Sequence, residues 1–523
     1  MANFSRTGLI TAGLLGLLAQ PAAAALTEAE QRGKQIYFEG TSPRGVLINA
    51  VVGDESTLIP ASAIPCANCH GYDGLGRPEG GVTPTDVRWS QLSKSYGHVH
   101  ESGRRHDAFD DESLSRSIIA GVDPANNQLD RAMPLYQMST EDMADLIAYM
   151  KVLENDLDPG VSNDRVQVAT LLPLSGPAGA TGEAMARIMQ GHFEDINKQG
   201  GIFGRRIDLL AVPFGQSAEA SLENLQQALR VEGAFAVVGA YTIGLDKALL
   251  DVLRTDNVPL IGPFTLDPGD AFLDSGAFYI YSGFDEQARA LADQAVLQGA
   301  DAGKIAVASP EDARFNSPVR AVREQVRTKT GGGAPDEQRY ASGEFDATEF
   351  AERVAGSEAL IFLGPQSDVE PLLAALDSKG LSPRVYLLSS LLAQPLFDAP
   401  ATFDRRIFIA YPTLSSDMTP KGREEYQSLA KTYSLPREHV QAQLAAFAAA
   451  KLLVEGLRRA GRDLSRVKLI EGIEELFAFQ TGVTPPLSYG PNRRIGARGA
   501  HIVAVDLANK RYAPIGDGWY ELR

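Results

Sequence analysis

The chain contains only two cysteines in 523 residues, and they lie three positions apart. Cys66 and Cys69 occur in the order Cys-Ala-Asn-Cys-His, with His70 directly after the second cysteine. This spacing is used for the attachment of c-type haem, in which each thiol forms a thioether and the histidine is placed to ligate the iron. The segment around Cys66 therefore has to fold around a large prosthetic group.

Two other uses of this motif fit less well. A redox-active CxxC pair does not need the following histidine and usually lies beside a βαβ unit. A structural zinc site needs a second pair of ligands, and the chain has no further cysteine. We therefore expect one covalently bound haem c, held by Cys66 and Cys69, with His70 as an iron ligand.

The sixth iron ligand is predicted from the sequence RAMP. Met133 lies there, well downstream of His70 and just before a predicted helix, and Met/His ligation is a recognised cytochrome c arrangement. Met138 is the main competitor. Ligation by two histidines would have to use His98, His100 or His106, which lie in a polar stretch typical of solvent-facing residues.

The first residues predict export. Arg6 precedes an apolar run from Leu9 to Ala19, and small residues follow up to Ala25, which is the pattern of a signal peptide over residues 1–25. The run is too short to span a bilayer, which needs about 20 apolar residues. We expect no later segment of that length, so the mature chain should be a periplasmic protein without a transmembrane segment.

The net charge of −17 argues against a nucleic-acid partner, because such a partner requires clustered Lys and Arg. It favours solubility and docking to a cationic surface.

The pattern of the chain changes at the stretch ENDLDPGVSND, predicted as a linker over residues 154–164. Residues 26–153 are predicted as helices and loops, with helices over 27–38 and 111–120 and a third after Ser139. Residues 165–523 alternate apolar strand runs with helical patterns, which indicates parallel sheets. The predicted strands cover 166–172, 207–211, 235–239, 258–262, 304–309, 359–364, 385–389 and 407–411.

The first domain resembles the class I c-type cytochromes. The matching features are Gly33 and Tyr37-Phe38 in the first helix, the motif at 66–70, Met133-Pro134, and Leu146 and Tyr149 in the last helix. The resemblance implies an all-α cytochrome c domain whose first and last helices cross through the glycine and the aromatic residues. It also implies His70 and Met133 as the axial ligands.

The second domain resembles the type I periplasmic binding proteins of the branched-chain amino acid receptor group. The matching segments are LLPLSGPAGATG, NKQGGIFGRRI, AVVGAYTIG, NVPLIGPFT and AHIVAVDLANKRYAPIG. The resemblance implies two α/β lobes around a cleft that closes on a small solute.

Carried over by position, the solute-binding candidates are Ser175, Tyr241, Thr242 and Thr265. Hydroxyls and free N–H groups at helix starts can hold an anion, although Ser and Thr at such positions often only cap helices.

In the second lobe the sequence departs from an amino acid receptor. It has Asp312-Ala313-Arg314-Phe315 where such a receptor has a tyrosine, and it offers Asp368 in place of a glutamate. These departures argue against an ordinary amino acid ligand. Arg314 is either a partner for an acidic ligand or a solvated surface residue.

Together these features predict a multidomain electron-transfer protein that is not an enzyme. Its all-α cytochrome c domain precedes a two-lobed α/β solute-binding domain that docks a small ligand or a redox partner. Related binding proteins are associated with quinoprotein dehydrogenases, so the resemblance implies such a dehydrogenase as electron donor. The alternative is a receptor for an ABC-type importer or a sensor, with haem as a redox gate. Haem catalysis would require a vacant sixth position.

Overall fold

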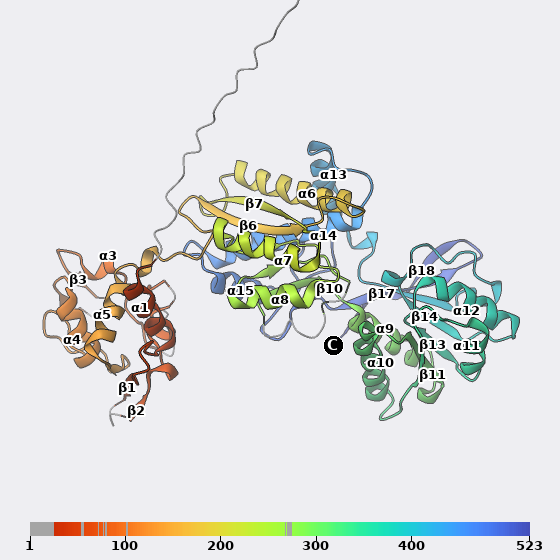
Figure 1. Cartoon of the computed structure of the whole chain (residues 1–523), viewed down its shortest axis with the longest axis horizontal. Helices are drawn as coiled ribbons and strands as arrows, with labels where there is room; N and C mark the ends of the chain where they lie inside the picture. Colours follow the sequence, from red (N-terminus) through yellow and green to blue (C-terminus); the bar gives the residue numbers. More distant parts are fainter. Residues whose placement is uncertain are drawn as a thin grey trace, which may run out of the picture. The chain divides into compact units, whose positions relative to one another are not determined.

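The computed structural model describes residues 26–523 except 54–56, 72, 77, 79–80, 101–102, 267, 269–274 and 523. The predicted signal peptide, residues 1–25, lies outside the described residues. The chain divides into two compact units, Met1–Asp156 and Leu157–Arg523 (Figure 1).

The three longer helices of the first unit begin where side chains satisfy free backbone N–H groups. Helix α1 (Glu28–Glu39) has a capping box made by Thr27 and Glu30, and helix α5 (Thr140–Met150) is capped by the Ser139 hydroxyl. Helix α4 (Asp111–Ala120) completes the three predicted helices. Two short helices, α2 (Cys66–His70) and α3 (Trp89–Leu92), lie between α1 and α4 in the sequence.

Helices α1 and α5 cross at Gly33. A Cβ atom at this position would lie 1.9 Å from the carbonyl oxygen of Asp145, so only glycine allows the two backbones to approach this closely. The rings of Tyr37, Phe38 and Tyr149 pack together beside the crossing, with centroids 5.2 to 6.0 Å apart. This is the crossing that the cytochrome resemblance implied.

The first unit also contains strands that the sequence analysis did not predict. Strands β1 (Asn49–Val52), β2 (Thr57–Pro60) and β5 (Leu135–Gln137) form an antiparallel sheet in the order β2-β1-β5, and β3 (His98–Val99) pairs with β4 (Arg105–His106). These strands are four residues long or shorter, which is too short for apolar alternation to be recognised.

The first lobe of the second unit is built on six parallel strands in the order β16-β10-β9-β8-β6-β7. The strands are β6 (Arg165–Leu172), β7 (Arg206–Pro213), β8 (Val237–Val238), β9 (Leu260–Ile261), β10 (Ala277–Tyr281) and β16 (Ile495–Ala497). One face packs on α6 (Gly179–Lys198), α14 (Val440–Ala460) and α15 (Arg466–Glu474), and the other on α7 (Ala218–Gln227) and α8 (Asp246–Thr255). Figure 1 shows that blue α14 and α15, late in the chain, lie in the same lobe as yellow β6 and β7.

The second lobe contains a seven-stranded sheet in the order β12-β11-β13-β14-β15-β17-β18. The strands are β11 (Ile305–Pro310), β12 (Asp336–Tyr340), β13 (Ala359–Phe362), β14 (Arg384–Leu388), β15 (Ile407–Tyr411), β17 (Gly499–Asp506) and β18 (Arg511–Glu521). The first five are parallel to one another, β17 runs antiparallel to β15, and β18 runs antiparallel to β17. Helices α9 (Phe284–Leu297) and α10 (Asn316–Lys329) cover one face, and α11 (Ala347–Arg353) and α12 (Gln366–Ser378) cover the other.

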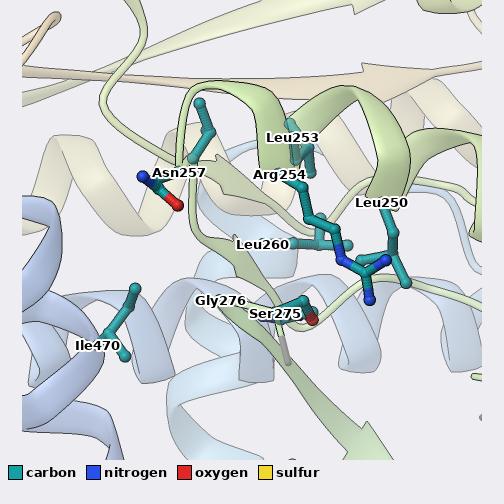
Figure 2. A pocket seen from close by; sticks show the side chains of 10 residues that line it. Leu250, Leu253, Arg254, Asn257, Leu260, Ser275, Gly276 and Ile470 are labelled. Atoms are coloured by element: carbon teal, nitrogen blue, oxygen red, sulfur yellow. Dashed lines mark hydrogen bonds between the residues drawn. The ribbon is translucent and has the colours of Figure 1, made fainter. Parts of the chain in front are cut away.

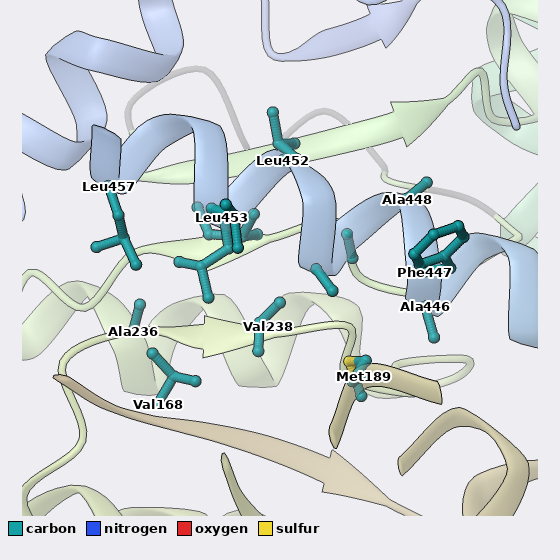
Figure 3. Packing of buried hydrophobic residues seen from close by; sticks show 14 of the residues in the cluster. Val168, Met189, Ala236, Val238, Ala446, Phe447, Ala448, Leu452, Leu453 and Leu457 are labelled. Carbon is teal, nitrogen blue, oxygen red and sulfur yellow. The ribbon is translucent and has the colours of Figure 1, made fainter. Parts of the chain in front are cut away.

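Helix α14 is the central helix of the first lobe. Figure 3 shows Leu453 and Leu457 directed at Ala236 and Val238 of the sheet. Among the described residues, α14 is the one helix long and apolar enough to cross a membrane, and 78% of its most apolar window is buried within the fold. The prediction that no later segment has this length was therefore wrong, and the apolar surface of α14 serves the core of the lobe.

Three segments connect the two lobes: 281–284, 411–420 and 497–499. The Ser282 hydroxyl donates to the carbonyl of Ala497 (3.0 Å) and accepts from the N–H of Gly499 (2.8 Å), which joins the first segment to the third.

A buried contact between His501 and Asp417 lies at the second connection. The Nε2 atom of His501 lies 2.7 Å from Asp417, whose carboxylate also accepts from the Thr413 hydroxyl at 2.9 Å. The Ser282 hydrogen bonds thus link the first connection to the third, whereas His501 links the second connection to β17.

Within the predicted linker, Asp156 is bonded to the first unit and Asp158 is bonded to the second unit. Asp156 accepts hydrogen bonds from Lys34 (2.7 Å) and Tyr149 (2.8 Å), whereas Asp158 accepts from the backbone N–H of Arg466 (2.6 Å). Only Leu157 separates these two anchored residues.

Candidate functional site

The attachment motif forms helix α2 in the first unit. Cys66 and Cys69 are free, half-buried thiols, and their spacing of three places both on one face of the helix. Burial raises the pKa of the Cys66 thiol to about 12, so it is held as a neutral thiol. Two thiols on one helical face match the two thioether bonds that the motif predicts.

His70 is oriented by one hydrogen bond. The side chain is 7% exposed, and its Nδ1 atom lies 3.0 Å from the carbonyl oxygen of Thr85. A carbonyl can only accept, so Nδ1 carries the hydrogen and the lone pair of Nε2 is left for a metal. Burial lowers the pKa of His70 and favours the neutral imidazole that ligates metals. Together with the two thiols, this donor set fits haem c.

Met133 and Met138 lie at the two ends of β5. Met133 ends a turn in which its N–H donates to Asp130 (3.0 Å), and Met138 follows the strand directly. Both side chains are half-buried against the same core, which also contains Tyr136 and Ile64. Met133 as the sixth ligand therefore stays a prediction.

The three other histidines of this unit lie together. The ring centroids of His98, His100 and His106 are 4.5 to 6.0 Å apart, and Arg104 lies 2.9 Å from Nε2 of His100. Burial, and then the charge of Arg104, lower the pKa of His100 to about 4. The rings face one another and Arg104, which does not favour them as partners of His70. No group of three or more His, Cys, Asp or Glu side chains in the described part of the chain is arranged to hold a metal ion.

In the second unit, the predicted solute residues follow neighbouring strands. Ser175 follows β6, Tyr241 and Thr242 follow β8, and Thr265 follows β9. The chain passes from β6 to β7 on one side and then to β8 on the other, so β6 and β8 flank a topological switch point. Ligands of open α/β sheets bind at the carboxyl ends of strands at such points.

The two threonines are brought together by a residue that the sequence analysis missed. The hydroxyls of Thr242 and Thr265 donate to the two carboxylate oxygens of Asp246, at 2.5 and 2.9 Å. Their hydroxyl hydrogens are therefore used within the chain, although we predicted that they could hold an anion. Asp246 is the first residue of α8, and its place in a helical pattern gave no sign of this role.

Tyr241 and Ser175 are more accessible. Tyr241 is half-buried, and its ring packs between Phe214 (6.0 Å) and Phe264 (5.6 Å). Ser175 is exposed in the loop before α6. This part of the sheet edge presents an aromatic surface beside the Asp246 carboxylate.

The two charged candidates of the second lobe have partners within the chain. Arg314 forms a forked pair with Asp312, with contacts of 2.7 and 3.1 Å, and its side chain is 72% exposed. Asp368 accepts a hydrogen bond from the Tyr340 hydroxyl at 2.8 Å. Arg314 is thus a solvated surface residue here, and Asp368 is already engaged.

A small pocket lies at the opposite edge of the first-lobe sheet. Figure 2 shows Leu250, Leu253 and Arg254 of α8 above Ser275 and Gly276. The pocket lies at the amino ends of β9 and β10 and has a volume of about 50 Å³, enough for a few water molecules. It includes none of the predicted solute residues.

Residues 165–511 match the protein family described as periplasmic binding protein, and residues 61–154 match the family described as cytochrome c. A relative from Brucella melitensis biotype 1, named Leu/Ile/Val-binding protein homolog 3, is 24% identical over 61% of this chain and 85% of its own length. An amino acid binding protein from Pseudomonas aeruginosa is 24% identical over 40% of this chain and 57% of its own length.

Two solved structures are similar in fold. A putative branched-chain amino acid ABC transporter protein from Rhodospirillum rubrum aligns with a TM-score of 0.55, 16% identity, 67% coverage of this chain and 100% of its own. A branched-chain amino acid ABC transporter protein from Thermus thermophilus with bound valine aligns with a TM-score of 0.52, 17% identity, 69% coverage of this chain and 97% of its own. At these identities, the similarity shows a common two-lobed fold.

Proposed function

Since the chain belongs to the periplasmic binding protein family and also carries a cytochrome c domain, we propose that it is a periplasmic electron carrier with a solute-binding domain. In this proposal, haem c is bound covalently by Cys66 and Cys69, and His70 and Met133 are the axial ligands. Export through a signal peptide over residues 1–25 delivers the chain to the periplasm.

The hydrogen bond from His70 to Thr85 carries this proposal. It fixes the tautomer and the ring orientation in the way that second-shell partners fix metal-ligating histidines. When bound, haem c supplies a single-electron couple. With both axial positions filled by protein side chains, no position remains for a substrate, so we do not assign an enzymatic activity.

The identity of the sixth ligand is tested with two matched variants. Met133→Ala should abolish the weak long-wavelength absorption that methionine sulfur gives with ferric haem, whereas Met138→Ala should retain it. The opposite result would assign the sixth position to Met138. An unchanged spectrum in both variants would reject both Met133 and Met138 as the ligand.

We place the solute at the carboxyl ends of β6 and β8, with an apolar part of the solute against Tyr241. The names of the relatives support a small-molecule solute. The test is a thermal-shift screen of the holoprotein against small periplasmic solutes, in the oxidised and the reduced state.

For a solute that binds, Tyr241→Ala should raise the dissociation constant by about tenfold or more. Thr255→Ala, at the other end of α8, should leave it unchanged. Equal effects of both variants would argue against this location.

The proposed electron donor is a periplasmic quinoprotein dehydrogenase. Rapid mixing of the oxidised protein with such a dehydrogenase and its substrate measures the rate of haem reduction. Fast reduction that does not depend on solute supports an electron carrier with an independent binding domain. Absence of reduction would exclude this class of donor.

A second candidate is a receptor for an importer or a sensor, in which the haem acts as a redox gate. The Ser282 hydrogen bonds favour it, because they join two of the connections between the lobes and linked connections suit a concerted closure. A solute that stabilises the oxidised and reduced forms unequally would support this function, since binding and reduction must then share a coupling free energy.

A further inference from the structure

Tyr136 links the attachment helix to the strand that carries the two methionines. Its side chain is 4% exposed, and its hydroxyl donates to the carbonyl oxygen of Ile64 at 2.7 Å. Ile64 lies two residues before Cys66, at the start of the attachment segment, and is 72 residues away from Tyr136 in sequence.

The strand itself fixes the direction of this side chain. Tyr136 is the middle residue of β5 and pairs with Ala50, which is fully buried. Neighbouring strand residues point to opposite faces, so the pairing directs the tyrosine into the core while Leu135 and Gln137 face the other way. Met133 is only three residues before Tyr136, so its backbone is anchored through the same strand.

The surroundings keep the hydroxyl protonated. Burial raises the pKa of Tyr136. Its O–H therefore remains a hydrogen-bond donor to the Ile64 carbonyl.

A second tyrosine holds the other end of the same segment. The Tyr37 hydroxyl donates to the carbonyl of Gly71 at 2.8 Å, directly after His70. Tyr37 belongs to α1, however, so it does not connect the attachment helix to the methionines. Of the two, only Tyr136 makes that connection.

We propose that Tyr136 is a positioning residue for the sixth iron ligand. Cys66, Cys69 and His70 all lie on α2, whereas Met133 reaches the iron from a separate part of the chain. The hydrogen bond from Tyr136 to Ile64 sets the distance between these two parts. Its loss loosens the bond between sulfur and iron and leaves the attachment of the haem intact. This inference rests on the proposed ligation by His70 and Met133.

The test compares Tyr136→Phe with Tyr149→Phe in the full-length holoprotein. Both variants lose one buried hydroxyl, but the Tyr149 hydroxyl bonds Asp156, far from the attachment segment in sequence. The readouts are the sulfur-to-iron absorption of the oxidised protein against temperature, the reduction potential, and the haem retained on a denaturing gel.

We expect Tyr136→Phe to retain its haem and to increase the equilibrium constant for loss of the sulfur ligand roughly fivefold, the size expected for one hydrogen bond. The reduction potential should fall, because methionine ligation raises it. Tyr149→Phe should match the wild type in all three readouts. Replacing Tyr136 with 4-aminophenylalanine, which keeps a donor at the same place, should restore the wild-type behaviour.

A Tyr136→Phe protein with wild-type absorption and potential would overturn the inference, as would an equal change in Tyr149→Phe. If Tyr136→Phe yields no holoprotein, the 4-aminophenylalanine variant decides: wild-type absorption and potential support the inference, and a lost sulfur band overturns it. Absence of the sulfur band in the wild type would instead reject the proposed ligation, and the inference with it.

Discussion

Asp145 is a carboxylate at the helix crossing in the first unit that pairs with two arginines. It is nearly buried and forms ion pairs with Arg32 (2.8 Å) and Arg44 (2.6 Å). Burial alone would raise its pKa, but the hydrogen bonds from Arg32 and Arg44 outweigh this and hold the pKa below the ordinary value of 3.8.

This pairing predicts a pH-dependent stability. A carboxylate whose pKa is lower in the folded state stabilises the fold above its unfolded pKa and loses this effect as the pH falls through the folded value. Asp145→Asn should therefore be less stable than the wild type at pH 7, and the difference should shrink below about pH 4. Asp111→Asn, at an exposed pair with Lys151, serves as the control and should change little. Denaturant unfolding across pH measures both, and a difference that does not vary with pH would contradict the assignment.

At the scale of single residues, the sequence predicted the groups whose spacing carries the chemistry. The positions of Cys66, Cys69 and His70 relative to one another are local and follow from one motif. Asp246 was missed because one of its two partners, Thr265, lies 19 residues away, although Thr242 is only four residues away. Ile64 was missed because its role depends on a partner that only the fold brings near. For Tyr136 and Ile64 that separation is 72 residues.

The crossing of α1 and α5 makes a prediction for these elements. Gly33→Ala should destabilise the first unit by about 3 kcal/mol, because its Cβ atom would overlap the backbone of Asp145 and force the helices apart. Gly303→Ala places a Cβ atom in open space and should leave the first unit unchanged. Thermal unfolding followed at the haem absorption distinguishes the two variants, and equal stability would contradict the close crossing.

The secondary structure was predictable where the pattern is long and local. The helices that follow Thr27 and Ser139 and the apolar strand runs of the second unit were all found as predicted. Strand β12 was not predicted, since its sequence DEQRY is polar and it lies at the edge of its sheet. Strand β10 was not predicted either. Its apolar residues lie buried inside the sheet, where polar and apolar residues do not alternate.

At the scale of the whole molecule, each unit has its own core, which predicts that each folds alone. Residues 26–156, produced with haem attachment, should show the same haem spectrum as the full chain. Residues 157–523 should unfold at the same temperature as the second unit of the full chain. Loss of the spectrum, or aggregation of either fragment, would show that the units depend on each other.

The central claim is a covalent haem at Cys66 and Cys69, and the most direct test is the intact mass of the denatured, purified chain. We predict the mass of the mature polypeptide plus one haem, with the haem iron still detectable on a denaturing gel. Exchange of both cysteines for serine should leave the bare polypeptide mass. A wild-type chain that loses its haem on denaturation, or that carries none after maturation in a competent host, would contradict the account.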